Sequence, residues 1–235
     1  MGACWTAVLT VCAAGVAHAQ TGTTTTPSYG TTAAQTYGTT DSYATSHWTV
    51  DSGETVGAGQ NVVRGQVGFP GLWGDFIHGL DSTTEIGGRL QINYGVEGLT
   101  SATHFEMAAQ FLARKQLVDT GKIKFALTFN PGLLFYTAFG STVFGITFPV
   151  EGQIGFPIDS KFTINGSFGL PMWVTFGDFG AFYLPIMFGG GVEYLLEHNI
   201  ALTFKLRMGP TIAFANGGSA SSFTLNALFG VAYRM

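Results

Sequence analysis

Four residues in one stretch of the chain carry side chains that could act together in hydrolysis. His104 and Glu106 stand two residues apart, Arg114 follows further along, and Ser101 supplies the nearest hydroxyl. A histidine base oriented by an acid can activate a serine as a nucleophile. No motif fixes nucleophile, base and orienting group together, and paired charges are also a common way to fill a narrow polar interior. We therefore predict a network of ion pairs at this position and no catalytic residue.

Metal and ligand motifs are also missing from the sequence. His47, His78 and His198 are isolated, whereas a metal site needs three or four converging ligands. Glycine pairs such as Gly87-Gly88 lack the helix and lysine of a phosphate-binding loop. The formal net charge of −4 includes no basic cluster that would attract nucleic acid. We expect no metal, no cofactor and no nucleic acid, and identify no small-molecule partner.

Composition sets this chain apart from ordinary soluble domains. Of its 235 residues, 46% are apolar and only 10% are charged, against roughly 25% charged residues in a typical soluble domain. The length suits a single domain of moderate size. With so few charges, the chain has little from which to build a solvated coat.

The sequence divides into three parts. Residues 1–19 resemble a secretory signal peptide, with an apolar stretch from Trp5 to Val16 and a small-x-small cleavage pattern at Ala17-His18-Ala19. Both cysteines fall inside it, so the mature chain would hold no disulfide or thiolate site. Residues 20–53, rich in Thr, Ser, Gly and Tyr, are expected to form a disordered linker. Residues 54–235 would form the folded domain.

Alternation of apolar and polar residues dominates this last part. In 104–117, His104, Glu106 and Arg114 share one parity, and Phe105, Met107 and Phe111 share the other. A two-residue period indicates strands, because a helix would mix the two sets. The pattern predicts ten strands, with eight as the alternative count: 61–69, 72–79, 85–96, 103–117, 122–136, 142–155, 161–175, 181–195, 200–213 and 222–235. Short polar links at 81–83, 119–121, 159–160 and 197–199 follow every second strand, which places them on one rim.

The uncharged stretch between Lys124 and Glu151 could be mistaken for a transmembrane helix. It contains Asn130-Pro131-Gly132, Gly145 and Pro149, residues that break helices. Strands are therefore favoured here too. Pro149, Pro171 and Pro185 lie inside predicted strands, where each removes a ladder hydrogen bond, so bulges or kinks are expected at these positions.

The two parities predict which face of the sheet meets water. The polar parity carries too few charges to coat an exterior but enough to fill a narrow lumen. The apolar parity would then face lipid, where a midplane Arg or Lys would cost roughly 2–4 kcal/mol. The predicted lumen charge network consists of Arg64, Arg89, Glu106, Arg114, Glu151, Glu193, Lys205 and Arg207. Aromatic girdles at the membrane interfaces are expected from residues that include Trp73, Trp173 and Tyr183.

These features together resemble a small, up-and-down outer-membrane β-barrel protein of Gram-negative bacteria. The resemblance rests on the signal peptide, the cysteine-free mature chain, the two-residue repeat and the last strand. In that class the final strand carries apolar residues at alternate positions as an assembly signal, and Phe229, Val231, Tyr233 and Met235 stand at those positions here. Met235 departs from the Phe or Trp that usually ends such chains. The resemblance implies a closed antiparallel barrel in the cell outer membrane, with membrane lipid and the barrel assembly machinery as partners.

The leading functional expectation is a non-enzymatic membrane barrel, either structural or a narrow, porin-like passive pore. Two alternatives stay open. One is an enzyme that acts on lipid or peptide at the barrel wall through His104 and Glu106. The other is a soluble, lipocalin-like barrel, in which the apolar parity would point inward and bind a ligand.

Overall fold

The computed structural model describes residues 47–94, 103–138, 141–177, 180–215 and 218–235. The predicted signal peptide and the predicted linker up to residue 46 lie outside these residues, as does Ser101. In the described part of the chain, no helix is long and apolar enough to cross a membrane.

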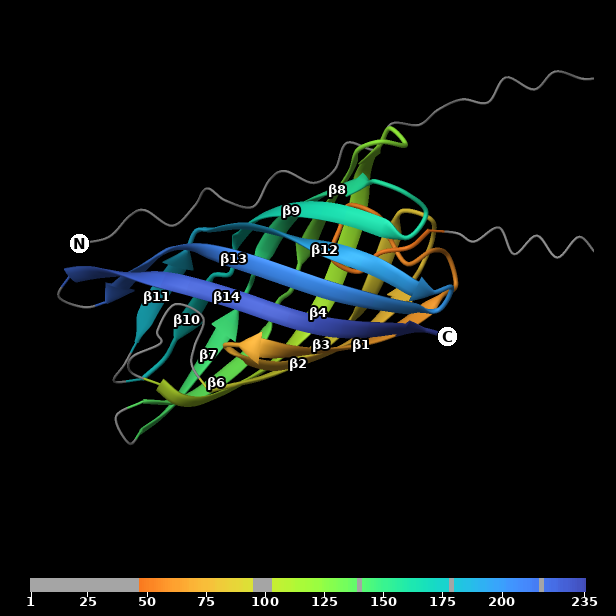
Figure 1. Ribbon diagram of the computed structural model, residues 1–235. Coiled ribbons are helices and arrows are strands. Elements are labelled where there is room, and N and C mark those ends of the chain that lie inside the picture. The colour runs from red at the N-terminus through yellow and green to blue at the C-terminus, as the bar shows by residue number, and fades with distance from the viewer. Residues whose placement is uncertain (1–46, 95–102, 139–140, 178–179, 216–217) are drawn as a thin grey trace, which may run out of the picture. The chain divides into compact units, whose positions relative to one another are not determined.

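Every regular element of the described residues is a β-strand, and all the strand pairs are antiparallel (Figure 1). The strands are β1 (Asn61–Phe69), β2 (Gly71–Gly79), β3 (Thr84–Asn93), β4 (Thr103–Asp119), β5 (Lys124–Phe129), β6 (Gly132–Ala138), β7 (Ser141–Thr147), β8 (Val150–Pro157), β9 (Phe162–Leu170), β10 (Trp173–Thr175), β11 (Ala181–Pro185), β12 (Met187–Glu197), β13 (Ile200–Ala215) and β14 (Gly218–Arg234).

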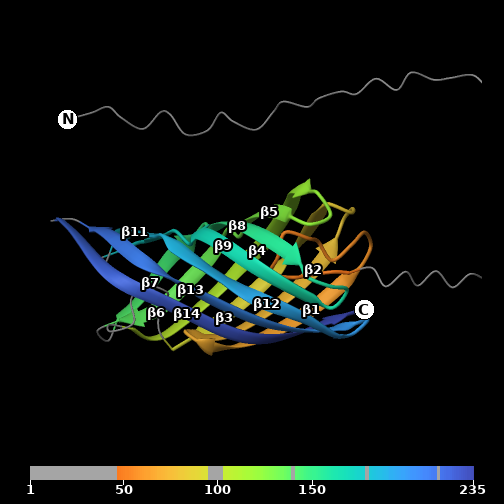
Figure 2. The ribbon, with the colours of Figure 1, turned by 45° about the horizontal axis from the view of Figure 1, so that its top comes forward.

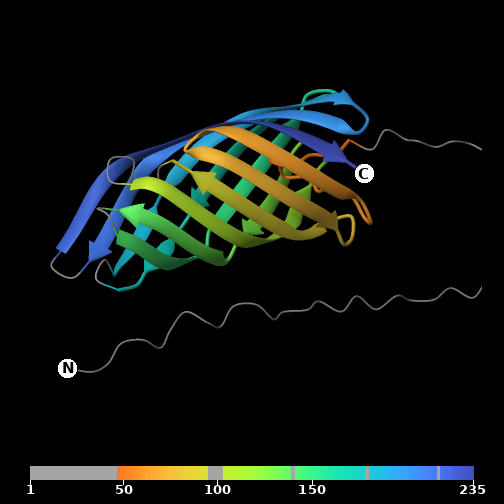
Figure 3. The same ribbon diagram turned by 90° about the horizontal axis from the view of Figure 1, so that it is seen from below.

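These elements form a closed barrel of ten strands, because four of the strands are each divided in two. β5 and β6 both pair with β4. On their other side, β8 pairs with β5 and β7 pairs with β6. β9 then pairs with β8, and β10 pairs with β7, and the divided strand β11/β12 continues the same pattern. β1 pairs with β14 from Val62 through Phe69, which closes the barrel. The predicted closed ten-strand barrel is confirmed. Figure 3 shows β1 to β3, in orange and yellow, side by side with the blue strand β14.

The divided strands break beside prolines, which have no N–H to donate to a ladder. β5 and β6 separate at Asn130-Pro131, and the other three breaks contain or follow Pro149, Pro171 and Pro185. Hydrogen bonds still cross the breaks: Asn130 N–H donates to the Pro149 carbonyl at 3.0 Å, and Ile186 N–H donates to the Pro210 carbonyl at 2.8 Å. The kinks expected from the sequence are therefore present as strand breaks on neighbouring strands.

The barrel has two unlike ends. The turn end, as we call it, carries the short connections 80–83, 120–123, 158–161 and 198–199, together with the C-terminus. The opposite loop end carries the long hairpin of β13 and β14, which Figure 2 shows extending beyond its neighbours. The sequence predicted that these strands end at 213 and begin at 222, but they continue to Ala215 and start at Gly218.

The two-residue period of the sequence sorts the side chains as predicted. Phe229, Leu225 and Val231 are exposed on the outer face, whereas Lys205 and Arg207 are buried on the inner face. A soluble barrel with an apolar interior would show the reverse arrangement. The apolar parity therefore coats the outside and the charged parity lines the lumen.

Candidate functional site: a plugged polar lumen

The most informative part of the lumen is the chain segment that precedes β1. Residues 47–56, which we call the plug, enter the barrel at the turn end (orange in Figure 1). Trp48, Asp51 and Ser52 are at most 3% exposed. The Trp48 indole N–H donates to the His198 carbonyl at 3.1 Å, and the Thr55 hydroxyl donates to the Ser82 carbonyl at 3.0 Å. The plug is therefore packed against the connections that form the turn end.

This placement corrects the predicted domain boundary. Residues 47–53 were assigned to a disordered linker on composition, with the barrel domain beginning at 54. The structure places them inside the barrel, so the folded domain begins no later than His47. The composition of this segment is that of a linker, but the barrel wall buries Thr49, Val50 and Ser52.

Glycines in both the plug and the wall allow this close packing. A Cβ atom on Gly53 would lie 2.1 Å from the Lys124 carbonyl oxygen, and one on Gly155 would lie 2.8 Å from the Ser52 hydroxyl oxygen. Both distances are shorter than van der Waals contact. Only residues without a side chain fit at these two positions.

Charged side chains of the wall bind the backbone of the plug. The Arg114 guanidinium donates to the carbonyls of Val50 and Glu54, each at 2.7 Å, and to that of Thr49 at 3.1 Å. The Glu193 carboxylate accepts the N–H groups of Val50 and Asp51 at 2.8 and 3.0 Å. These groups satisfy backbone polar atoms that would otherwise be buried without partners.

A third wall residue, Glu85, completes this recognition. Its carboxylate accepts the Val56 N–H at 3.0 Å and forms an ion pair with Arg114, whose Nε lies 2.7 Å from Glu85 Oε1. Arg114 is thereby held in position from the wall while it contacts the plug.

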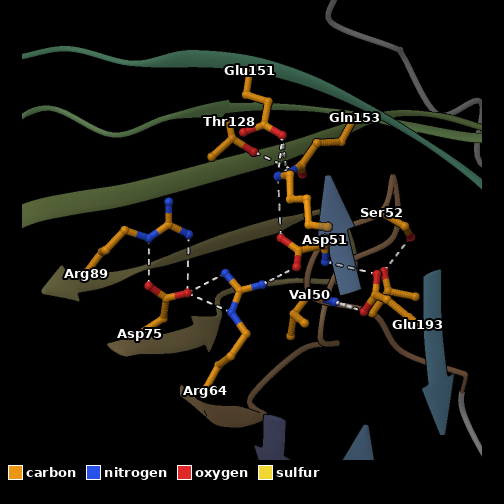
Figure 4. A network of polar contacts seen from close by, with 12 residues as sticks. Val50, Asp51, Ser52, Arg64, Asp75, Arg89, Thr128, Glu151, Gln153 and Glu193 are labelled. Carbon is orange, nitrogen blue, oxygen red and sulfur yellow. Dashed lines mark hydrogen bonds and ion pairs between the residues drawn. The ribbon is translucent and has the colours of Figure 1, made fainter. Parts of the chain in front are cut away.

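The Asp51 side chain of the plug points into a group of charged wall residues inside the barrel (Figure 4). Its carboxylate lies 2.6 Å from Arg64 and 3.6 Å from the Lys205 ammonium. Arg64 also pairs with Asp75, which binds Arg89 at 2.7 Å from its other oxygen. The plug therefore joins a network that links β1, β2, β3 and β13.

The same network extends toward the loop end through Glu151. Its carboxylate pairs with Lys205 at 2.5 Å and with Arg207 at 3.0 Å. Arg89 and Arg207 both stack over the Trp73 ring, with guanidinium-to-centroid distances of 5.1 and 6.0 Å. The cations of this half of the lumen thus have anionic and aromatic partners.

A cavity of about 40 Å³ lies at the level of the proline breaks. Its lining includes Arg89, Glu106, Asn130, Pro149, Glu151 and Arg207. A water molecule needs roughly 10–15 Å³ of such space, so the cavity has room for a few waters. Trp173, which also lines the cavity, stacks on Tyr183 with ring centroids 4.8 Å apart and packs with Leu134 and Tyr136. This aromatic cluster narrows the lumen further.

All eight residues of the predicted lumen charge network face the interior. Arg64, Arg114, Glu193, Lys205 and Arg207 are at most 5% exposed. Glu106 and Glu151 are also buried, and the Arg89 side chain is 11% exposed. The structure brings seven of the eight into the contacts described above and places Glu106 on the wall of the cavity.

Sequence reasoning missed three anions that complete this network. Asp75 and Glu85 share the inward parity of their strands, so the alternation already contained their signal. Asp51 gave no signal, because no strand pattern covers the plug. The aromatic girdle was partly wrong: Trp73 and Trp173 are buried in the lumen, and Tyr183 stacks on Trp173.

The residues with catalytic potential do not assemble into a described site. Glu106 lines the cavity, whereas Ser101 and the side chain of His104 lie outside the described part of the chain. Among the residues that the structure covers, no group of three or more His, Cys, Asp or Glu side chains could hold a metal ion.

Aspartates organise the short connections of the turn end. The Asp81 carboxylate accepts the Thr83 hydroxyl at 2.8 Å and the Thr83 N–H at 2.6 Å. These two bonds lower the pKa of Asp81 from 3.8 to about 2, and the bond from the hydroxyl has the larger effect. Backbone N–H groups likewise lower the pKa of Asp119, through Gly121, and of Asp159, through Lys161.

Comparisons with known proteins give likenesses in structure only. No family model matches the chain, and no curated protein matches it. Among solved structures, the outer membrane protease OmpT from Escherichia coli is 8% identical, with a TM-score of 0.39, and the match covers 75% of this chain and 93% of that one. The N-terminal β-barrel domain of OprF from Pseudomonas aeruginosa is 12% identical, with a TM-score of 0.31, and the match covers 75% and 96%.

Proposed function

We propose that the protein is an integral outer-membrane β-barrel whose lumen is closed by its own plug, and that it acts as a non-enzymatic structural element of the membrane. The observation that carries this proposal is the plug itself, buried where a pore would need open space. The small central cavity and the aromatic cluster at its wall support the same conclusion. The sequence left open whether the barrel is structural or a passive pore, and the filled lumen favours the structural function.

The outer surface supports membrane insertion. Large apolar side chains such as Phe76, Phe111 and Phe229 are 48%, 50% and 61% exposed on it. An exposed apolar area of this extent is unfavourable in water and favourable against acyl chains. Nine residues of β1, at about 3.4 Å each and a tilt of roughly 40°, span about 23 Å along the barrel axis, close to the apolar band of membrane barrels.

The last strand supports delivery to the outer membrane. Phe229, Val231 and Tyr233 point outward from β14, and Met235 continues the same parity. We propose that the barrel assembly machinery recognises these residues before β14 pairs with β1. The turn end, which also holds the plug, would face the periplasm.

Planar-bilayer recording of the purified full-length chain tests the closed state. We expect no single-channel steps at neutral pH, with heat-dependent migration on a gel as evidence that the inserted barrel is folded. Regular single-channel steps from folded protein would contradict the structural version and restore the passive pore. Recovery of the protein in the soluble fraction without detergent would contradict membrane insertion itself.

A further inference from the structure

The plug has the contacts of a bound peptide more than those of a strand of the fold. Residues 47–60, all of which the structure describes, contribute no strand to the sheet, and the barrel closes through β1 and β14 without them. The wall holds the plug largely through side chains that bind its backbone: Arg114 through carbonyls, and Glu193 and Glu85 through N–H groups.

The covalent connection between plug and wall is short and lies at the surface. Residues 57–60 link Val56 to β1, and Ala58 and Gly59 are exposed. Gly57 and Gly59 have φ values of +96° and +70°, which suit a glycine turn. Cutting this turn would leave every wall contact of the plug in place.

The binding surface selects for sequence as well as for an extended backbone. Asp51 places a carboxylate between Arg64 and Lys205, while Trp48 and Val50 occupy an apolar cluster with Ile77 and Leu112. A peptide that lacks the central carboxylate would leave two buried cations with fewer partners. An acidic residue with apolar residues one and three positions before it is therefore the signature of a ligand for this wall.

We propose that the lumen wall is a peptide-binding site, filled in the resting state by residues 47–56 of the same chain, and that the plug is exchangeable for a peptide of the same chemistry. The ligand is the plug segment of a second copy of this chain, an extended segment with a central carboxylate. Release of the plug leaves the Arg64, Arg114 and Lys205 side chains facing an open turn end. That release of the plug opens the lumen rests on the proposed function, in which the plug closes the barrel. Binding of a peptide to the wall does not depend on that proposed function.

The experiment uses the full chain, folded before it is cut. A protease recognition sequence inserted between Ala58 and Gly59 allows cleavage after insertion into lipid vesicles. The probe is a fluorescent synthetic peptide of residues 47–58, and its matched control carries Asp51→Asn. We expect the cut barrel to retain its own plug, to exchange it for the probe, and to bind the control at least about 30-fold more weakly.

Two results would overturn the proposal: no exchange of the probe into a cut barrel that still shows heat-dependent migration, or equal binding of the probe and the Asn control. Bilayer steps from the uncut protein would contradict the closed state alone, because probe exchange is read by fluorescence. If the insertion prevents folding, the uncut chain with Ser52→Cys provides a second measurement. Adding Asp51→Asn should then accelerate thiol labelling at position 52 by about tenfold or more, and an unchanged rate would refute an Asp51-dependent latch.

Discussion

Arg114→Met should lower the free energy of unfolding by about 3–5 kcal/mol, the usual cost of leaving one member of a buried ion pair without its partner. Arg114 Nε lies 2.7 Å from Glu85 Oε1, and both side chains are at most 2% exposed. At an effective dielectric constant near 20, an attraction over this distance exceeds about 4 kcal/mol. The substitution also leaves the plug carbonyls of Val50 and Glu54 without their donor.

Urea unfolding in lipid vesicles, followed by tryptophan fluorescence, measures this change. Adding Glu85→Leu to Arg114→Met removes both charges and should recover more than about 1.5 kcal/mol of the loss. Lys115→Met is the matched control, because Lys115 is the exposed neighbour whose ammonium donates to the Thr83 and Thr84 hydroxyls, and it should cost less than about 1 kcal/mol. The role assigned to the Arg114–Glu85 pair would be refuted if Arg114→Met lost no more unfolding free energy than Lys115→Met. It would also be refuted if the losses of Arg114→Met and Glu85→Leu simply added in the double variant.

Three further predictions address the packing of the plug, the turn end and the outer surface. Gly53→Ala should cost about 1–3 kcal/mol in urea unfolding, because the new Cβ meets a wall carbonyl, whereas Gly65→Ala, with nothing within 4 Å, should stay within about 0.5 kcal/mol. The pKa of Asp81 is lower in the folded chain than in the unfolded one, so its contribution to stability is full above about pH 4 and is lost as the pH falls toward 2. An NMR titration of Asp81 in micelles should show a midpoint near 2, and a midpoint near 3.8 would contradict the turn geometry. Phe229→Arg should lower stability in vesicles by about 2–4 kcal/mol if that face meets lipid, and a neutral effect would argue for a water-facing surface.

Strand number and side-chain direction were predictable because a two-residue period is a local property of the sequence. Phe204 and Lys205 are neighbours, yet Lys205 is buried in the lumen, whereas the Phe204 ring packs against the exposed Phe229 ring with centroids 4.6 Å apart. Proline placement was equally readable, since a missing N–H breaks a ladder wherever it falls. The length of the β13–β14 hairpin was underestimated, because Ser219 and Ser221 have the composition of a loop although they form a strand.

The plug could not be predicted, because its burial depends on partners far away in the sequence. Asp51 meets Lys205 and Glu193, and His47 meets Thr163, so the binding surface exists only after the barrel has closed. Trp73 was assigned to the membrane interface for a related reason. Its aromatic character is typical of a girdle, and only the inward parity of β2 places it under Arg89 and Arg207.

The ionic contacts explain why the plug is more than a filler of space. Asp75 is shared between Arg64 and Arg89, and Glu151 is shared between Lys205 and Arg207, so each of these wall carboxylates serves two cations. Asp51 contacts one cation from each pair, Arg64 and Lys205, and connects the two groups. Removing the plug would therefore weaken the electrostatic balance of both groups at once, and that coupling makes a single carboxylate suited to hold the segment in place.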